Sequence, residues 1–290
     1  MRAILIFSLF IVLAFIVGAI LAYPLKLALD PVLGLEYRRY LNYATLISGV
    51  IISGIYLQLY NLLSFSAFGY SGNAKKFITS VLNGFVYGLL IMLMIELILF
   101  VLDIHEIDTS RDFSINAILF LFVKAVLAGL LIALVEESIF RGALFTGLYK
   151  QTGAFITVLF SSLVYSTVHF IRYREVPADT EIGWLTGLEM MPYAFRRFQH
   201  WSITDYFLTL FIFGVLLGLL RLKHRNIAAC IGVHAGIVML IKVASFFTNR
   251  THNSSYDHLV SQYNSTFGWI SFIVILLFTI FYLVKLKKPR

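Results

Sequence analysis

The stretch Leu131–Phe145, LIALVEESIFRGALF, places three ionisable residues inside an apolar run, in a chain that is apolar almost throughout. These residues are Glu136, Glu137 and Arg141. An ionisable side chain inside a membrane costs about 2.5–3.5 kcal/mol even on a lenient insertion scale, so each one needs a reason. If the run crosses a membrane, the stretch therefore predicts a functional site.

Composition places the chain among α-helical membrane proteins. Of its 290 residues, 60% are hydrophobic and 13% are charged. Long uncharged runs recur along the chain, whereas β-barrel strands would leave short alternating patterns. The net charge of +8 comes from short Lys and Arg clusters between these runs, which is typical of membrane topology signals. We expect membrane lipids as partners and no nucleic acid. The single cysteine, Cys230, excludes a disulfide within the chain.

The fold class that we predict is an all-α polytopic membrane protein, a bundle of about eight transmembrane helices with the site inside it. We treat residues 1–290 as one membrane domain with a catalytic core at about 115–247. A span needs about 20 apolar residues. The eight predicted spans are 3–23, 43–63, 81–102, 115–135, 154–170, 206–221, 227–247 and 267–284. The first is interpreted as a transmembrane helix, because it is long for a secretory signal and lacks a clear cleavage site.

The spacing within Leu131–Phe145 predicts different surroundings for its two carboxylates. Glu137 and Arg141 are four residues apart with the acid first, so they lie one above the other on a helix and can pair. Glu136 is turned by about 100° from Glu137 and need not share the arginine. One carboxylate is thereby neutralised and the other is left free to act as a base. The alternative is a cluster of charges at a helix end on the membrane surface.

Two later runs carry histidines that reach a similar depth. In LVYSTVHF, Tyr165 and His169 are four apart on one helix face. If the chain turns at KQTG, 150–153, Glu136 and His169 both stand about 22–26 Å from the hairpin tip. The run NIAACIGVHAGIVMLIKV places His234 about 12 Å from its own start. We therefore expect Glu136, His169 and His234 to share one level inside the bundle.

Three groups of these types suit hydrolysis. Glu136 can remove a proton from water, His169 can hold that water, and His234 can stabilise the developing oxyanion or the leaving group. The same three side chains, with water as a fourth ligand, would equally suit a divalent metal such as zinc. The sequence requires no cofactor and leaves metal-free and metal-assisted attack both open. It contains no H-E-x-x-H, G-x-S-x-G or Gly-rich phosphate-loop motif.

These motifs resemble those of the CPBP intramembrane proteases, which include the CAAX prenyl endopeptidases and the bacteriocin-processing and immunity proteins. EESIFR resembles the first motif, YSTVH the second and the start of HAGIV the third, over about 121–243. The resemblance implies that Glu136 is the catalytic base, that His169 and His234 belong to the same site, and that Glu137 and Arg141 support it. Tyr165 is the aromatic residue of the second motif. The implied substrate is a membrane-anchored protein or peptide, lipidated in the prenyl endopeptidases.

The third motif departs from the family pattern at Val238, where Asn or Asp is common. Valine can neither donate a hydrogen bond nor bind a metal. The alternative to an endopeptidase is therefore a weak or inactive scaffold, immunity or regulatory protein on the same fold. We expect a multi-pass protein of a prokaryotic plasma membrane, with cytoplasmic termini because the tail and two links on its side are basic.

Three further features carry expectations of their own. The aromatic link 173–204 is expected to lie in the membrane interface or to fold back over the bundle. Glu96 and Lys124, on consecutive spans, lie about 10 and 15 Å from their shared link and could pair. Lys242 is expected to extend towards an interface. Arg172 and Arg174 would lie deep in the membrane unless their helix is short or they line a wet cavity.

Overall fold

The computed structural model describes residues 2–59, 63–171, 173, 176 and 180–287. Helices make up most of it, and the remaining regular structure is a two-stranded sheet. The long helices are α1 (Arg2–Leu33), α2 (Tyr37–Leu59), α3 (Ala74–Val101), α4 (Ile115–Glu137), α5 (Phe145–Phe170), α7 (Thr204–His224), α8 (Ala228–Phe247) and α9 (Trp269–Lys287). The short elements are α6 (Thr186–Ala194), the π-helix η1 (Ser138–Leu144), the 3₁₀ turns η2 (Arg196–Gln199), η3 (Trp201–Ile203) and η4 (Asp257–Leu259), and strands β1 (His105–Ile107) and β2 (Thr248–Arg250).

The predicted all-α polytopic membrane fold is confirmed. Within the described residues, six helical stretches are long and apolar enough to cross a membrane, and a seventh, Trp269–Lys285, is shorter. One of the six, Ile115–Phe170, is a 56-residue stretch that contains two of the predicted spans. If that stretch is counted as two helical arms, the six stretches and Trp269–Lys285 correspond to the eight predicted spans.

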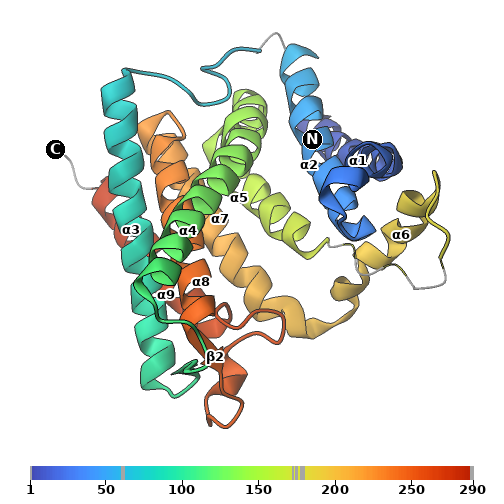
Figure 1. Cartoon of the computed structure of the whole chain (residues 1–290). Helices are drawn as coiled ribbons and strands as arrows, with labels where there is room; N and C mark the ends of the chain where they lie inside the picture. Colours follow the sequence, from blue (N-terminus) through green and yellow to red (C-terminus); the bar gives the residue numbers. More distant parts are fainter. Residues whose placement is uncertain (1, 60–62, 172, 174–175, 177–179, 288–290) are drawn as a thin grey trace.

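The turn between these two arms lies at Gly153, inside the predicted KQTG segment. Its backbone angles are φ 76° and ψ 179°, a conformation that residues with a Cβ atom rarely adopt. From Ile115 to Thr152 the chain runs helically through α4, η1 and the start of α5, and after Gly153 it turns back (Figure 1). The helical hairpin therefore forms where the sequence indicated.

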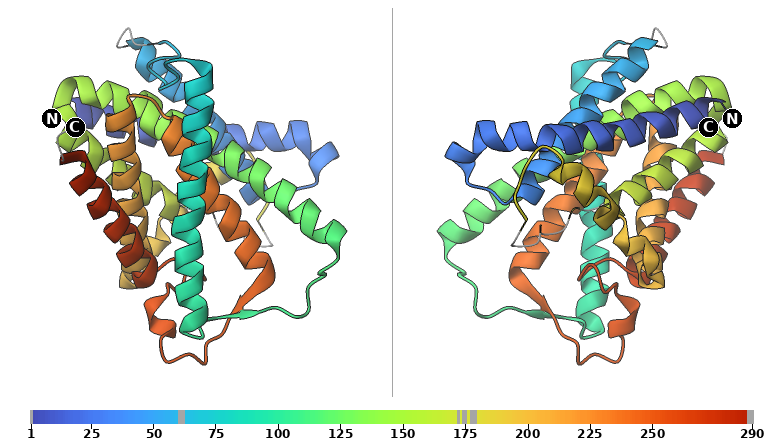
Figure 2. Two further views of the ribbon diagram at one scale, coloured as in Figure 1. Left: turned by 90° about the vertical axis from the view of Figure 1, so that its left-hand side faces the viewer. Right: turned by 90° about the vertical axis from the view of Figure 1, so that its right-hand side faces the viewer.

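The helices form two groups with α5 and α7 between them. Helices α1, α2 and α6 lie together on one side, and α3, α4, α8 and α9 lie on the other (Figure 1). Figure 2 shows α1 running across the direction of α3. The largest buried apolar cluster joins α3, α5, α7, α8 and α9, and includes Ile95, Leu99, Phe170 and Leu217. The first helix packs along α2 and also contacts α5, as expected of a structural helix.

Helix α8 is held by close backbone contacts on two sides. A Cβ atom added to Gly88 of α3 would lie 2.2 Å from the carbonyl oxygen of Val233, and one added to Gly129 of α4 would lie 2.7 Å from that of Ala235. Glycine is therefore required for α3 and α4 to approach α8 this closely. These contacts fix the helix that carries His234.

The expected pairing of Glu96 with Lys124 is wrong. Glu96 is buried and binds the Nδ1 of His105 at 2.9 Å, while the Nε2 of that imidazole lies 2.9 Å from the carbonyl oxygen of Ser265. Lys124 is exposed, and its amine lies 4.9 Å from the ring centre of Phe120. A histidine in the loop after α3 reaches back to the acid more readily than a lysine on the next helix does.

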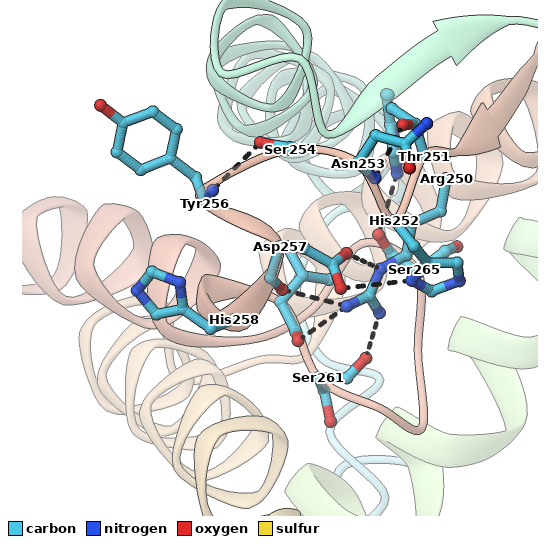
Figure 3. Close-up of polar contacts among 12 residues, drawn as sticks. Arg250, Thr251, His252, Asn253, Ser254, Tyr256, Asp257, His258, Ser261 and Ser265 are labelled. Carbon is cyan, nitrogen blue, oxygen red and sulfur yellow. Dashed lines mark hydrogen bonds and ion pairs between the residues drawn. The ribbon is translucent and has the colours of Figure 1, made fainter.

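The polar link between α8 and α9 is ordered around one arginine. The guanidinium of Arg250 donates to the Asp257 carboxylate at 2.6 Å and to the carbonyl oxygens of residues 257, 260 and 261 (Figure 3). Strand β2 pairs antiparallel with β1, with His105 opposite Arg250. The link and the loop after α3 therefore form one polar unit at this end of the helices.

The aromatic link folds back onto the first two helices. Its helix α6 packs against α1, and Met190 and Ala194 share a buried cluster with Ala22 and Leu41. Trp201, near the end of the link, is 92% exposed. Arg172 and Arg174 lie outside the described residues, so the depth expected for them in the membrane is not tested. Lys242 is exposed on α8, as a side chain that extends towards an interface would be.

Candidate active site

Glu136 and His169 meet because they lie almost equally far from the turn at Gly153. Glu136 is 17 residues before that glycine and His169 is 16 residues after it. With the same rise per residue on both arms, equal counts place both side chains at one height. The Nε2 of His169 lies 3.7 Å from the Oε2 of Glu136.

His234 joins them from α8. Its Nε2 lies 3.9 Å from the same Oε2 of Glu136. Its side chain is 4% exposed, whereas those of Glu136 and His169 are 24% and 19% exposed. The structure thus brings the three predicted catalytic residues together, with His234 deepest in the protein.

The two carboxylates of the EE pair point in different directions. Glu136 lines a cavity of about 690 Å³, whereas the side chain of Glu137 is fully buried. The carboxylate of Glu137 lies 3.5 Å from the guanidinium of Arg141, which is also fully buried. One acid is thus paired in the interior while its neighbour faces a cavity.

Glu137 has a second partner that the sequence did not indicate. Its Oε1 lies 2.8 Å from the Nδ1 of His234. An ionised carboxylate can only accept a hydrogen bond, so Nδ1 of His234 carries the proton. Glu137 therefore connects Arg141 to His234 and orients the imidazole that faces Glu136.

His169 is oriented in the same manner by the main chain. Its Nδ1 lies 2.7 Å from the carbonyl oxygen of Tyr165, which can only accept, so this nitrogen also carries a proton. The ring of Tyr165 packs on that of His169, with centroids 4.4 Å apart. The guanidinium of Arg141 also packs on Tyr165, with its central carbon 4.3 Å from the ring centre. Tyr165 thus contacts both the buried cation and the imidazole.

The arrangement leaves an unsatisfied acceptor between the two histidines. Oε2 of Glu136 is buried and has no hydrogen-bond partner among the described residues. In the neutral imidazoles, both Nε2 atoms are acceptors as well, because both Nδ1 atoms carry the proton. Three acceptors separated by 3.7 and 3.9 Å require a donor between them, and one water molecule can donate two hydrogen bonds.

As they are placed, these donors lie slightly wider apart than the ligands of a zinc ion. Zinc ligands about 2.0–2.2 Å from a tetrahedral metal lie about 3.4 Å from one another, which is shorter than the 3.7 and 3.9 Å found here. No group of three or more His, Cys, Asp or Glu residues in the described part of the chain has the arrangement of a metal site.

The segment directly after the two acids, which carries Arg141, is a π-helix from Ser138 to Leu144. Such segments are rare and occur frequently at functional sites. The Nε of Arg221, near the end of α7, donates to the main-chain carbonyl of Arg141 at 2.9 Å. On the other side, the hydroxyls of Tyr70 and Ser138 lie 2.6 Å apart. Sequence alone does not indicate this contact, because the target of Arg221 is a main-chain atom.

Comparison with known proteins agrees with the site. Residues 117–240 match the family model described as Type II CAAX prenyl endopeptidase Rce1-like. The match spans Glu136, His169 and His234, and it supports assignment of the chain to the CPBP and CAAX protease family. No curated protein and no solved structure matches the chain significantly. The match covers 124 of the 290 residues and makes this part of the chain similar to prenyl endopeptidases, and the six apolar helical stretches among the described residues fit a multi-pass membrane protein.

Proposed function

We propose that the protein is an intramembrane endopeptidase of the glutamic type, in which Glu136 activates water to cleave a peptide bond. The observation that carries the proposal is the buried, unsatisfied Oε2 of Glu136 between the Nε2 atoms of His169 and His234, at the wall of a cavity. The substrate is a protein or peptide associated with the membrane, because the cavity lies among apolar helices.

In the proposed reaction, a water molecule sits between Glu136 and the two imidazoles. Glu136 takes a proton from that water as its oxygen attacks the scissile carbonyl carbon. The C–N bond then breaks, and the leaving nitrogen receives a proton from Glu136. His169 fixes the position of the water through Nε2.

His234 acts on the charge that develops during this step. The proton that Glu136 takes from the water can move to Nε2 of His234, 3.9 Å away, and the imidazolium then donates to the oxyanion of the tetrahedral intermediate until the proton returns through Glu136 to the leaving nitrogen. Glu137 stabilises that imidazolium, because its carboxylate lies 2.8 Å from Nδ1. Glu137 and Arg141 are therefore positioning residues, and Glu136, His169 and His234 are the proposed catalytic residues.

We propose that the attack requires no resident metal, since the 3.7 and 3.9 Å separations exceed the spacing of about 3.4 Å between two ligands of a tetrahedral zinc ion. Dialysis of the purified protein against a strong chelator tests this. We expect cleavage to survive dialysis. Loss of cleavage that is restored by added zinc would instead support the zinc site of Glu136, His169 and His234.

The test of the reaction uses the purified protein in lipid nanodiscs and a peptide library read by mass spectrometry. We expect cleavage by the wild type and none by Glu136→Gln or His169→Ala, with both variants folded and inserted. Equal and negligible cleavage by wild type and Glu136→Gln would refute the enzyme.

Val238 favours a second candidate, a scaffold or regulatory protein on the same fold. It lies one turn after His234 on α8 and can donate no hydrogen bond. This candidate predicts a membrane partner that copurifies equally well with wild type and Glu136→Ala, and no proteolysis of that partner.

We propose the plasma membrane of a prokaryote as the location, with both termini cytoplasmic. The basic residues around Lys75 and Arg225 lie on the side of the C-terminal tail in the predicted topology. In support, the hydroxyl of Ser71 donates to the carbonyl of Arg225 at 3.3 Å, so the two basic links meet. Reporter fusions at the C-terminus, active only in the cytoplasm or only outside it, test the orientation.

A further inference from the structure

The link between α2 and α3 follows one face of the helical segment that comes after Glu136. Residues 63–73 of this link run from the group of α1 and α2 to the group of α3 and α8 (Figure 1). They contact Ser138, Gly142 and Thr146, which are four residues apart and therefore lie on one side of the segment. We call residues 63–73 the strap.

Two of these three contacts are made by the main chain of the strap. The hydroxyl of Thr146 donates to the carbonyl oxygen of Ala67 at 2.8 Å. A Cβ atom added to Gly142 would collide with the carbonyl oxygen of Phe68, so glycine is required for the strap to approach this closely. Ala67 also shares a buried cluster with Ala143. The strap therefore packs directly on η1, the π-helix that follows the two acids.

The contact at Ser138 is a directed chain of two hydrogen bonds. The Ser138 hydroxyl donates to the carbonyl oxygen of Leu134 at 2.5 Å, because that oxygen can only accept. Its single proton is thereby used, so the hydroxyl of Tyr70, 2.6 Å away, donates to the Ser138 oxygen. A serine that bonds back to the carbonyl four residues earlier bends a helix, and the change from α4 to the π-helix occurs at Ser138. Tyr70 thus holds the chain where its helical geometry changes, two residues after Glu136.

The strap also holds the start of α8. The main-chain carbonyl of Gly69 accepts from the N–H of Ile227 at 3.1 Å, and the ring of Tyr70 packs in one cluster with the same isoleucine. His234 comes seven residues after Ile227, which is about 10 Å along α8. One short segment therefore binds both to the helix that carries Glu136 and to the helix that carries His234.

The strap lies away from the cavity of the candidate active site. At 3.6 residues per turn, its three contacts lie roughly 140° around the helix from the cavity-lining face. Tyr70 is not among the cavity-lining residues that the structure describes. The hydroxyl of Tyr70 therefore acts on the reaction only through the position of other residues. The hairpin residues that line the cavity on this segment are Glu136, Ile139, Phe140 and Leu144.

We propose that Tyr70 is a positioning residue, whose hydrogen bond to Ser138 sets the separation between Glu136 and His234. This inference rests on the proposed function, in which these two side chains contact one water molecule. Oε2 of Glu136 and Nε2 of His234 are 3.9 Å apart. Without the hydrogen bond from Tyr70, the segment behind Glu136 is free to shift relative to α8. The water then loses its contact with one of the two side chains, while substrate binding in the cavity is unaffected.

The first test measures cleavage of a library-derived peptide in nanodiscs, well below the unfolding temperature of every variant. We expect Tyr70→Phe and Ser138→Ala to lower kcat about tenfold with KM unchanged, since a shift of about 1 Å would cost about 100-fold. The double variant should be no slower than Ser138→Ala, because both changes remove one contact. Ser138→Thr keeps the hydroxyl and should keep kcat. The matched control is Tyr87→Phe, which removes an exposed hydroxyl from α3 and should change neither constant.

The second test reports the geometry without any reaction. The protein is labelled with ¹⁵N at its histidines, and long-range ¹H–¹⁵N NMR spectra in nanodiscs give the ring nitrogen resonances, which His234→Gln assigns. We expect the Nε2 resonance of His234 to move in Tyr70→Phe and Ser138→Ala, because the position of the proposed water changes. It should stay in place in Ser138→Thr and Tyr87→Phe.

A wild-type kcat in Tyr70→Phe, or an unmoved His234 resonance, would overturn the proposal. So would a raised KM with an unchanged kcat, because Tyr70 would then act on the substrate. The resonance separates this failure from failure of the enzyme. If the wild type cleaves and both measurements are unchanged in Tyr70→Phe, the enzyme stands and the role of Tyr70 falls. If no peptide is cleaved but the resonance moves, the strap stands without the reaction.

Discussion

The contact between Gly88 and α8 makes a quantitative prediction about the candidate active site. In Gly88→Ala the new Cβ would lie 2.2 Å from the carbonyl oxygen of Val233, the residue before His234. A carbon normally lies at least about 3.3 Å from such an oxygen, so α8 must move away by about 1.1 Å. The oxygen belongs to the backbone, so no rotamer change relieves the contact. His234 moves with the helix.

We expect this displacement to lower kcat/KM about 100-fold, because an error of about 1 Å in the position of a reacting group has that effect. Overpacking should also lower the free energy of unfolding by about 1–3 kcal/mol. The matched control is Gly54→Ala on α2, where an added Cβ meets nothing within 4 Å. That variant should keep its activity and gain up to about 1 kcal/mol from the better helix propensity of alanine.

The assays are cleavage of a library-derived peptide in nanodiscs and thermal unfolding of the same preparations. If Gly88→Ala resembles Gly54→Ala in both measurements, close backbone packing does not hold His234 in place. If Gly88→Ala is destabilised but cleaves at the wild-type rate, the site tolerates the displacement, and the mechanism that depends on His234 is wrong.

Three further predictions concern other parts of the molecule. Burial lowers the pKa of His105, but the hydrogen bond and charge of Glu96 outweigh it and hold the pKa above its ordinary value of 6.5. The pair therefore stabilises the fold below about pH 6.5 and less as pH rises through the raised pKa of His105, so the unfolding temperature should fall towards that of His105→Gln as pH rises above about 6.5. A constant difference would contradict this. Arg221→Met leaves a main-chain carbonyl of the π-helix without its donor and should cost about 1–3 kcal/mol in thermal unfolding, whereas Lys223→Met, exposed on the same helix, should cost less than about 0.5 kcal/mol. Val238→Asn adds a donor one turn after the site histidine of α8 and should raise kcat about tenfold; an unchanged kcat would show that the oxyanion lies elsewhere.

The meeting of Glu136 and His169 was predictable because few quantities determine it. The helical rise is nearly constant. The tip of the hairpin is marked by Gly153 in KQTG, which has a positive φ angle. Counting residues on both sides of Gly153 therefore gave the correct level for both side chains. The split between a buried Glu137 and a cavity-facing Glu136 followed from the same helical geometry.

Contacts between distant segments were not predictable in the same way. The second partner of Glu137, the Nδ1 of His234, is separated from it by 97 residues and depends on how α8 rotates about its axis. The partner of Glu96 was misassigned because the loop after α3 bends back, which charge spacing along spans does not indicate. No sequence motif indicates that α1 and α2 line the cavity. The lining residues are mostly apolar, and arginines near helix ends are common in membrane proteins.

The two carboxylates of the site differ in their partners, because Glu137 is paired with a buried cation and Glu136 is not, and this has a measurable consequence. Oε1 of Glu137 has hydrogen-bond partners in Arg141 and His234, and its Oε2 lies 3.5 Å from Arg141, while Oε2 of Glu136 is buried without a hydrogen-bond partner among the described residues. An unsatisfied buried acceptor costs about 1–3 kcal/mol, more if it is charged. In Glu136→Gln, the amide can donate to the Nε2 of His169 or His234, and the charge is lost. We therefore expect this variant to lose cleavage and to unfold at a temperature about 2–4 °C higher per kcal/mol recovered. Glu137→Gln is the matched control. The same change there breaks an existing network, so it should lower the unfolding temperature. A lower unfolding temperature for Glu136→Gln as well would mean that Glu136 is already satisfied in the folded protein, and it would remove the reason for placing the reactive water there.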